Sequence, residues 1–407
     1  MPKRLGLLAL AALALWALPA HGQNATLPEG GGKELVEAHC AQCHGLSQIV
    51  RSGYTRAGWQ NTVAMMVNAG AKLTPEQAGI VTDYLAKNFP EKPMPAAALL
   101  SGSAKVTIKE WPVPTAGSRP HDPLATPDGS IWYTGQMADV LGRLDPVTGA
   151  IKEYRLPPDS GPHGLVADRD GNIWYTANFK GYIGKLDPKT GHVTEYRLPD
   201  PAARDPHTPL FDHNGILWFT VQGANMVGRL DPATRAIKLE TVPTPRSNPY
   251  GMVISSKNVP FFVEFGSYKI ASIDPQTMAI HEYPLPWEGA RPRRVAITSD
   301  DVLWYSDYAR GYLGRFDPKT GKAEEWASPG GPKSRPYGIT QIAGIIWYSE
   351  SGVSPNTIVR FDPKTEKFQT WAIPSGGDVV RNMMPTKDGN IAIACSGANR
   401  VGLVEIH

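Results

Sequence analysis

The chain has 407 residues, of which 41 are Gly and 38 are Pro, and only 19% are charged. This length accommodates two domains with cores of their own, and 9% aromatic residues favour a turn-rich all-β protein over a disordered chain. Without Lys3 and Arg4, 39 basic residues face 38 acidic ones, which gives no basis for nucleic acid as a partner or for binding to a membrane surface.

Residues 1–22 have the pattern of a secretory signal peptide. Lys3 and Arg4 form a basic start, an apolar run continues to Leu18, and small residues near Ala20 offer a cleavage site. The run is short for a membrane span, although an uncleaved anchor is the alternative. We therefore predict an exported protein with no membrane span after cleavage of the signal.

The next motif is the C-x-x-C-H pattern of covalent haem attachment, formed by Cys40, Cys43 and His44. The two thiols would add to the haem vinyl groups, and the imidazole would ligate the iron. A zinc half-site and a redox C-x-x-C are the alternatives, but a second cysteine pair for zinc and a surrounding βαβ pattern are both missing. The third cysteine, Cys395, has no obvious disulfide partner, so we interpret it as a small buried residue. Export combined with this motif predicts a periplasmic protein that carries one haem c.

Helical patterns flank the motif. Residues 31–40 predict a short helix that runs into it, and residues 73–89 predict a second helix, with Thr74 as N-cap and Pro75 in the first turn. This order of helix, C-x-x-C-H and final helix resembles a small class I cytochrome c. The resemblance covers about 70 residues, and we assign residues 24–95 to it.

That resemblance implies a methionine as the second axial ligand of the haem iron, opposite His44. Met66 fits best, since it follows a tryptophan and precedes the segment Asn-Ala-Gly-Ala, and Met65 is the neighbour that could replace it. Met94 lies beyond the final helix and is a poor candidate. Residues 96–104 are rich in Ala and Ser and predict a linker.

The remainder of the chain repeats one phrase, of which "DGNIWYTANFKGYIGKLDPKTGHVTEYRLP" is one copy. Six copies carry a landmark aromatic at a spacing of 42 to 44 residues: Trp132, Trp174, Trp218, Phe261, Trp304 and Trp347. A seventh copy has Ala392 at this position. Short alternating strands at this period predict β-propeller blades of four strands each, with D-P-x-T-G as a hairpin turn.

The seventh copy ends before its fourth strand. Residues 105–114, "KVTIKEWPVP", have the pattern of that strand, and borrowing it would close the ring and protect the sheet edges. The predicted fold is therefore mainly β, with a seven-bladed β-propeller over 105–407 preceded by a small all-α cytochrome c domain.

The repeat phrase G-x-[IL]-W-[FY]-[ST], followed by a Gly-[Arg/Lys] pair, resembles the virginiamycin B lyase (streptogramin lyase) family of seven-bladed propellers. The resemblance covers almost all of 105–407. It implies the fold far better than the activity, because repeated residues mostly encode packing.

A candidate site follows from comparing blades at one mouth of the ring, where first strands start and second strands end. The first-strand positions are His121, His163, His207, Tyr250, Arg293, Tyr337 and Arg381. The second-strand positions are Gly135, Ala177, Val221, Glu264, Asp307, Glu350 and Cys395. We predict a polar cavity with imidazoles on one side and carboxylates and guanidiniums on the other, for a ligand or a metal. The three histidines could converge on a divalent metal ion. Alternatively, these side chains only satisfy one another around a wet channel.

The family resemblance implies elimination chemistry, with a histidine base in the last blade and a magnesium ion held by two glutamates. Here Arg381 stands where the histidine would be, and Val379 replaces the first glutamate. Cys395 or Ser396 occupies the place of the second. The lyase residues are therefore not preserved in register.

Three functions remain as hypotheses. The first is periplasmic electron transfer by the haem, with a propeller that binds a small-molecule substrate or a redox partner protein. The second is a propeller lyase or hydrolase with an accessory haem domain, and the third is a non-catalytic scaffold. The haem motif favours the first, because a fixed and ligated haem is usually an electron carrier.

Overall fold

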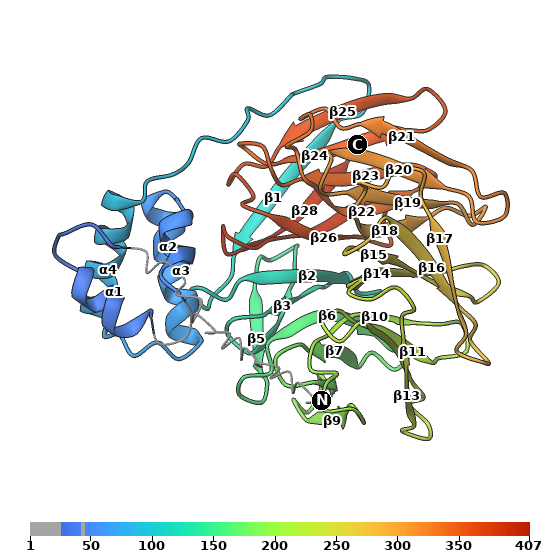
Figure 1. The fold of residues 1–407 in the computed structure, drawn as a ribbon, viewed down its shortest axis with the longest axis horizontal. Helices are drawn as coiled ribbons and strands as arrows, with labels where there is room; N and C mark the ends of the chain where they lie inside the picture. Colours follow the sequence, from blue (N-terminus) through green and yellow to red (C-terminus); the bar gives the residue numbers. More distant parts are fainter. Residues whose placement is uncertain (1–25, 42–44) are drawn as a thin grey trace, which may run out of the picture.

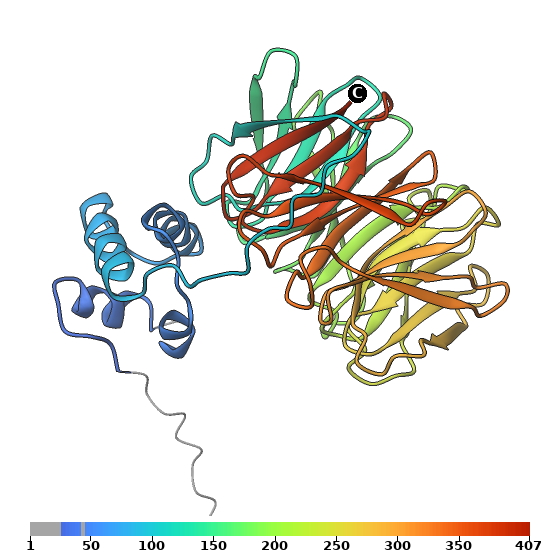
Figure 2. The ribbon, with the colours of Figure 1, turned by 90° about the horizontal axis from the view of Figure 1, so that it is seen from above.

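The computed structural model describes residues 26–41 and 45–407, which form a small helical region and a β-propeller. The two lie side by side in both views of the ribbon (Figures 1 and 2). The predicted signal peptide and the motif residues Cys43 and His44 lie outside the described residues. No helix in the described ranges is long and apolar enough to cross a membrane.

The described part of the N-terminal region contains four helices: α1 (Lys33–His39), α2 (Ser47–Arg51), α3 (Arg56–Asn68) and α4 (Pro75–Asn88). The helix start predicted at Thr74 is present, because its hydroxyl accepts a hydrogen bond from the backbone N–H of Gln77 and the Gln77 side chain accepts from the Thr74 backbone N–H. The helices enclose a core of nine buried side chains, which includes Val36, Trp59 and Val81. Trp59 also donates its indole N–H to the carbonyl of Phe89 at 2.7 Å, which fixes the end of α4.

The propeller contains seven sheets of four antiparallel strands. Blade 1 holds β2 (Pro120–Ala125), β3 (Ile131–Gly135), β4 (Val140–Leu144) and β5 (Ile151–Arg155). Blade 2 holds β6 (Pro162–Ala167), β7 (Ile173–Ala177), β8 (Tyr182–Leu186) and β9 (Val193–Arg197). Blade 3 holds β10 (Pro206–Phe211), β11 (Leu217–Val221), β12 (Met226–Leu230) and β13 (Ile237–Thr241). Blade 4 holds β14 (Pro249–Ile254), β15 (Pro260–Glu264), β16 (Lys269–Ile273) and β17 (Ile280–Pro284).

The remaining blades follow the same order. Blade 5 holds β18 (Pro292–Ile297), β19 (Leu303–Asp307), β20 (Tyr312–Phe316) and β21 (Ala323–Ala327). Blade 6 holds β22 (Pro336–Ile342), β23 (Ile345–Glu350), β24 (Thr357–Asp362) and β25 (Lys367–Ala372). Blade 7 joins β26 (Val380–Pro385), β27 (Ile391–Cys395) and β28 (Arg400–Ile406) to the first strand of the chain, β1 (Val106–Pro112). Because β1 pairs with β28 from Val106–Ile406 to Pro112–Arg400, the ring has no open blade.

The repeat phrase is explained by packing within each blade. The landmark Trp174 stacks on Tyr196 of the outer strand, with ring centroids 5.2 Å apart, and other blades repeat this pair. The glycine of the third strand lies under the next aromatic: a Cβ on Gly184 would lie 2.1 Å from the ring of Tyr175. In the D-P-x-T-G turn of blade 1, Asp145 accepts a hydrogen bond from the hydroxyl of Thr148. The repeated residues therefore serve the fold.

The helical region is attached to the propeller along two routes. The segment predicted as a linker runs over blade 6, where Leu100 and Thr370 exchange hydrogen bonds and Ala96 pairs with Ser354 (Figure 1). Helix α3 contacts loops at the mouth where the first strands start. Asn61 donates to the carbonyl of Gly397 at 2.7 Å, and Asn68 donates to that of Ala116 at 3.0 Å.

Candidate functional site

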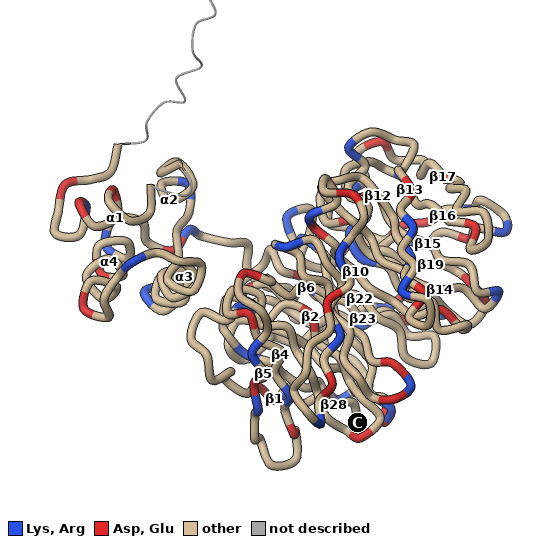
Figure 3. Tube along the Cα trace, turned by 90° about the horizontal axis from the view of Figure 1, so that it is seen from below, with Lys and Arg blue, Asp and Glu red and all other residues tan. Residues whose placement is uncertain are grey.

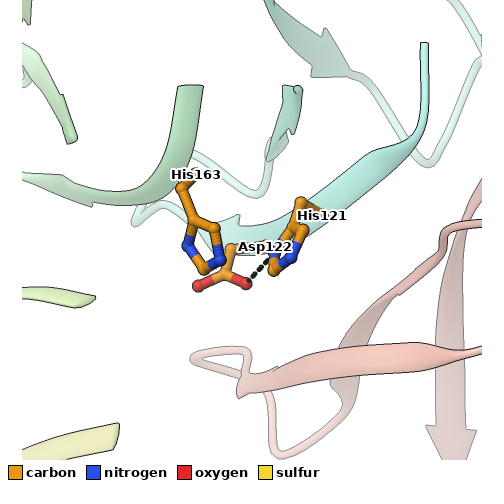
Figure 4. A group of neighbouring side chains, drawn as sticks. All are labelled: His121, Asp122 and His163. Carbon is orange, nitrogen blue, oxygen red and sulfur yellow. Dashed lines mark hydrogen bonds and ion pairs between the residues drawn. The ribbon is translucent and has the colours of Figure 1, made fainter. Parts of the chain in front are cut away.

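Each first strand of the ring contains a β-bulge at the residue that the sequence comparison selects. In blade 1, Pro120 pairs with Gly135 and Pro123 with Tyr133, so one extra residue lies between them, and all seven blades repeat this shift. A bulge breaks the alternation of faces, so neighbouring residues on the strand can approach one region. Both His121 and Asp122 are buried and bond to each other at 2.9 Å (Figure 4).

A hydroxyl on the second strand holds the bulge in five blades. Thr176 accepts a hydrogen bond from the backbone N–H of Gly164 at 2.9 Å and donates to the carbonyl of His207 in the next blade at 2.7 Å. The equivalent residues bond in the same way: Thr134, Thr220, Ser306 and Ser349. The Ser/Thr of the repeat phrase therefore links the inner strands of neighbouring blades.

The seven predicted first-strand residues come together as a ring, which we call the mouth ring. The centroids of His121 and His163 are 3.8 Å apart, and those of His163 and His207 are 3.6 Å apart. The series continues through Tyr250, Arg293, Tyr337 and Arg381. The ring centroids of His207 and Tyr250 are 4.0 Å apart, and the arginine guanidinium carbons lie 3.9 to 6.0 Å from the centroids of the neighbouring tyrosine rings. The hydroxyls of Tyr250 in blade 4 and Tyr337 in blade 6 are hydrogen-bonded to each other at 2.5 Å.

The predicted carboxylates occupy different surroundings. Glu264 accepts a hydrogen bond from Ser267 at 2.7 Å, Asp307 pairs with Arg310 at 2.8 Å, and Glu350 accepts from Ser328 at 2.6 Å. These are contacts with turns and with the loops that join blades. In the part of the chain that the structure describes, these carboxylates make no hydrogen bond or ion pair with the mouth ring. The three carboxylates therefore bond to turns and loops rather than to the imidazoles of the mouth ring.

The residue directly after each mouth-ring residue belongs to a second layer, which the sequence analysis did not predict. Reading one residue further along each first strand gives Asp122, Gly164, Thr208, Gly251, Arg294, Gly338 and Asn382. Glycine thus alternates with a polar residue, and this alternation is the signal that could have revealed the layer. A Cβ on Gly164 would lie 2.3 Å from Pro209, so there is no room for a side chain at that position.

The four polar residues of this layer, which we call the plug, meet across the propeller axis. Arg294 donates to both carboxylate oxygens of Asp122 at 2.8 and 3.0 Å, and Asn382 donates to the same carboxylate at 3.1 Å. Thr208 accepts from Arg294 at 3.4 Å. Beyond the plug lies a cavity of about 260 Å³, lined by inner-strand side chains such as Met252. The plug therefore lies between the mouth ring and this axial cavity.

The electrostatics of the mouth ring are dominated by arginines. Burial, followed by the charges of Arg381 and Arg119, holds the pKa of His121 well below its usual value. The same burial lowers the pKa values of His163 and His207. Arg119, which sequence comparison also missed, has its pKa lowered to about 10, first by burial and then by the charge of Arg381. The three histidines are therefore neutral at pH 7.

Neutral imidazoles can ligate a metal ion, and potential ligand atoms of His121, Asp122 and His163 lie within 4.8 Å of one another. The Nδ1 atom of His163 is buried without a hydrogen-bond partner. However, both oxygens of Asp122 already bond to Arg294. A cation at this point would have to displace that guanidinium.

A second cavity lies inside the helical region. It is lined mostly by apolar side chains, among them Ile49, Trp59 and Leu85, and both Cys40 and Met66 border it. The backbone of Met65 instead lies against the propeller loop, where a Cβ on Gly117 would come within 2.5 Å of its nitrogen. Cys395 is fully buried in the core of blade 7, and burial raises its pKa.

Fold and site together define a seven-bladed propeller whose mouth ring draws one residue from every blade. A family model described as the virginiamycin B lyase family matches residues 100–329, so the chain belongs to this family. A solved streptogramin B lyase is 28% identical and covers 74% of this chain and 98% of its own, with a TM-score of 0.68. Virginiamycin B lyase from Staphylococcus aureus is 25% identical over 74% of this chain and 99% of its own, with a TM-score of 0.67. No curated protein matches the chain by sequence.

Proposed function

We propose that this protein is exported to the bacterial periplasm, carries one covalent haem c in its helical region and transfers electrons. Its propeller binds the small-molecule substrate or partner protein with which those electrons are exchanged. The observation that carries the proposal is that Cys40 of the C-x-x-C-H motif and Met66 line the same apolar cavity. They are 26 positions apart in the sequence, and only the fold brings them together.

The residues present fit the group. A porphyrin is a large apolar ring, and the cavity offers Ile49, Trp59 and Leu85 to contact it. The thiols of Cys40 and Cys43 would hold the ring covalently, while the His44 imidazole and the Met66 thioether would ligate the iron. When bound, haem supplies a one-electron redox couple.

Helix α3 connects this cavity with the propeller. Its residues Trp59 and Met66 line the cavity, and the ring of Tyr54 packs edge-on against Trp59, with centroids 5.0 Å apart. Through Asn61 and Asn68 the same helix donates hydrogen bonds to loops at the mouth of the propeller. A molecule bound at the mouth ring would therefore lie on the side of the propeller that carries the haem region.

The test is expression in a periplasm that attaches haem c, followed by absorption spectroscopy of the purified full chain. We expect a covalent, reducible low-spin haem with a weak sulfur-to-iron charge-transfer band. Met66→Ala should remove this band, whereas the matched variant Met65→Ala should keep it. Recovery of folded protein without covalent haem would overturn the proposal, and high-spin iron in the wild type would overturn the role of Met66.

Lyase activity is a second candidate, supported by membership of the virginiamycin B lyase family. The family match ends at residue 329, before the last-blade segment that contains Arg381. There Arg381 contacts the ring of Tyr337 and bonds to Ser396, so no imidazole is offered at this position. Magnesium-dependent ring opening of a cyclic ester, lost in His163→Ala or His207→Ala, would favour the lyase; absence of turnover would remove it.

A further inference from the structure

Three arginines at the mouth of the propeller have no carboxylate partner. Arg119, Arg293 and Arg381 are half-buried, and none of them forms an ion pair with a carboxylate of the described ranges. Their neighbour Arg294 differs, because it is buried and paired with Asp122 in the plug. A partly buried charge without a partner is destabilising, so these guanidinium groups are favourable places for an anion to bind.

Arg293 is the most constrained of the three. Its guanidinium carbon lies 3.9 Å from the ring centroid of Tyr337, 4.2 Å from that of Tyr308 and 4.5 Å from that of Phe265. Its Nε atom is buried and has no hydrogen-bond partner among the described residues. The aromatic faces stabilise the positive charge, but they do not accept hydrogen bonds from all the N–H groups in the plane of the guanidinium. Some of these N–H groups therefore remain free to bind a ligand.

The surrounding carboxylates do not neutralise this charge. Asp122 bonds through both oxygens to Arg294, and Glu264 and Asp307 bond to local turns. Asp378 lies within electrostatic range of Arg381, but burial raises its pKa and the two form no ion pair. The histidines beside the arginines are neutral. The guanidinium groups of Arg119, Arg293, Arg294 and Arg381 therefore lie at this mouth, and of these carboxylates only Asp122 pairs with one of them, Arg294.

We propose that Arg119, Arg293 and Arg381 bind a small oxyanion, a carboxylate or phosphate group, at the mouth ring. Guanidinium groups match the geometry of both anions and bind them with two parallel hydrogen bonds. The Tyr250–Tyr337 pair beside Arg293 adds a hydroxyl donor. The inference deepens the binding role that we propose for the propeller and assigns an anionic class to its ligand, and it does not require haem.

The experiment is titration calorimetry of the full chain at low ionic strength with two probes, inorganic phosphate and succinate. We expect binding of at least one probe, and the comparison decides between a phosphate and a carboxylate. Arg293→Gln and Arg381→Gln should each weaken binding roughly tenfold or more, since each removes charge-assisted hydrogen bonds. Arg155→Gln, on an exposed outer strand, is the matched control and should bind like the wild type.

Folding is followed in the same samples by thermal melting, and Arg381→Lys tests charge separately from geometry. The probe should raise the melting temperature of the wild type but not that of the glutamine variants. Absence of binding to both probes would overturn the inference, as would equal losses in Arg155→Gln. Haem absorbance is recorded alongside, so loss of haem and loss of anion binding are told apart.

Discussion

Arg294 of blade 5 and Asp122 of blade 1 are 172 residues apart in the sequence, yet the guanidinium bonds to both carboxylate oxygens across the propeller axis. The side chains of both residues are 4% exposed, so water screens the pair weakly. Asn382 and His121 complete the hydrogen bonding of the carboxylate. The pair therefore ties opposite sides of the ring at the level where the inner strands bulge.

Asp122→Asn should destabilise the propeller by about 3–5 kcal/mol, because it leaves the buried Arg294 without a counter-charge. Denaturant unfolding would measure the loss. Asp159→Asn is the control: Asp159 pairs with Lys180 at the surface of the propeller, where both side chains are about half exposed or more. That change should cost less than about 1 kcal/mol. Equal effects of the two variants would contradict the importance of the plug.

Thr176→Val should lower the free energy of unfolding by about 1–3 kcal/mol, since it leaves the Gly164 N–H and the His207 carbonyl unpaired. Valine keeps the shape of threonine and removes only the hydroxyl. Blade 4 carries Val263 at the equivalent position, so the blade fold itself tolerates the residue. We expect Thr194→Val, on the outer strand β9, to be nearly neutral in the same denaturation assay.

Glu264→Gln should change how stability depends on pH. Burial raises the pKa of Glu264 from 4.5 to about 7, and one of its oxygens has no hydrogen-bond partner. A raised pKa favours the folded state below pH 4.5, and this contribution is lost as pH rises toward 7. The wild type should lose up to about 3 kcal/mol through this group by pH 8. Glu264→Gln should abolish that loss, and Glu240→Gln, on an exposed strand, should not.

Gly117→Ala should separate the helical region from the propeller mouth. Its Cβ would lie 2.5 Å from the backbone of Met65 in α3, at a residue with φ of 65°. Gly129→Ala is a matched control, because φ is 85° there but nothing lies within 4 Å of the added carbon. Small-angle scattering should show a larger radius of gyration for the first variant only. Expansion of both variants would indicate backbone strain as the cause.

The ring architecture could be predicted because each blade repeats the same packing. Trp174 and Gly184 have counterparts at the same position of other blades, and both residues make their contacts within their own blade. The repeated sequence therefore predicts these contacts directly. The mouth ring could also be located, since aligned repeats place His121 and Arg381 at equivalent positions. Acidic and basic residues intermingle along the tube in Figure 3, without a repeat of this kind.

The plug and the surroundings of Glu264 could not be predicted from alternation. A regular strand would direct Asp122 away from the face of His121, and only the bulge brings both into one cluster. Glu264 lies at the same end of the propeller as the mouth ring, but its carboxylate accepts a hydrogen bond from Ser267 in the adjacent turn. Register locates a residue at the end of a strand without fixing the direction of its side chain. The haem assignment stays a prediction, since Cys43 and His44 lie outside the described residues.

The pairing of β1 with β28 has a consequence for synthesis of the chain. Lys109 and Glu405, which form an ion pair across these strands, are 296 residues apart. Among the strands of the propeller, β1 is thus synthesised before all others and β28 after them. Until β28 has been synthesised the ring cannot close, and β1 keeps an unpaired edge while six blades form. A chaperone that shields extended segments would therefore be expected to act on this strand.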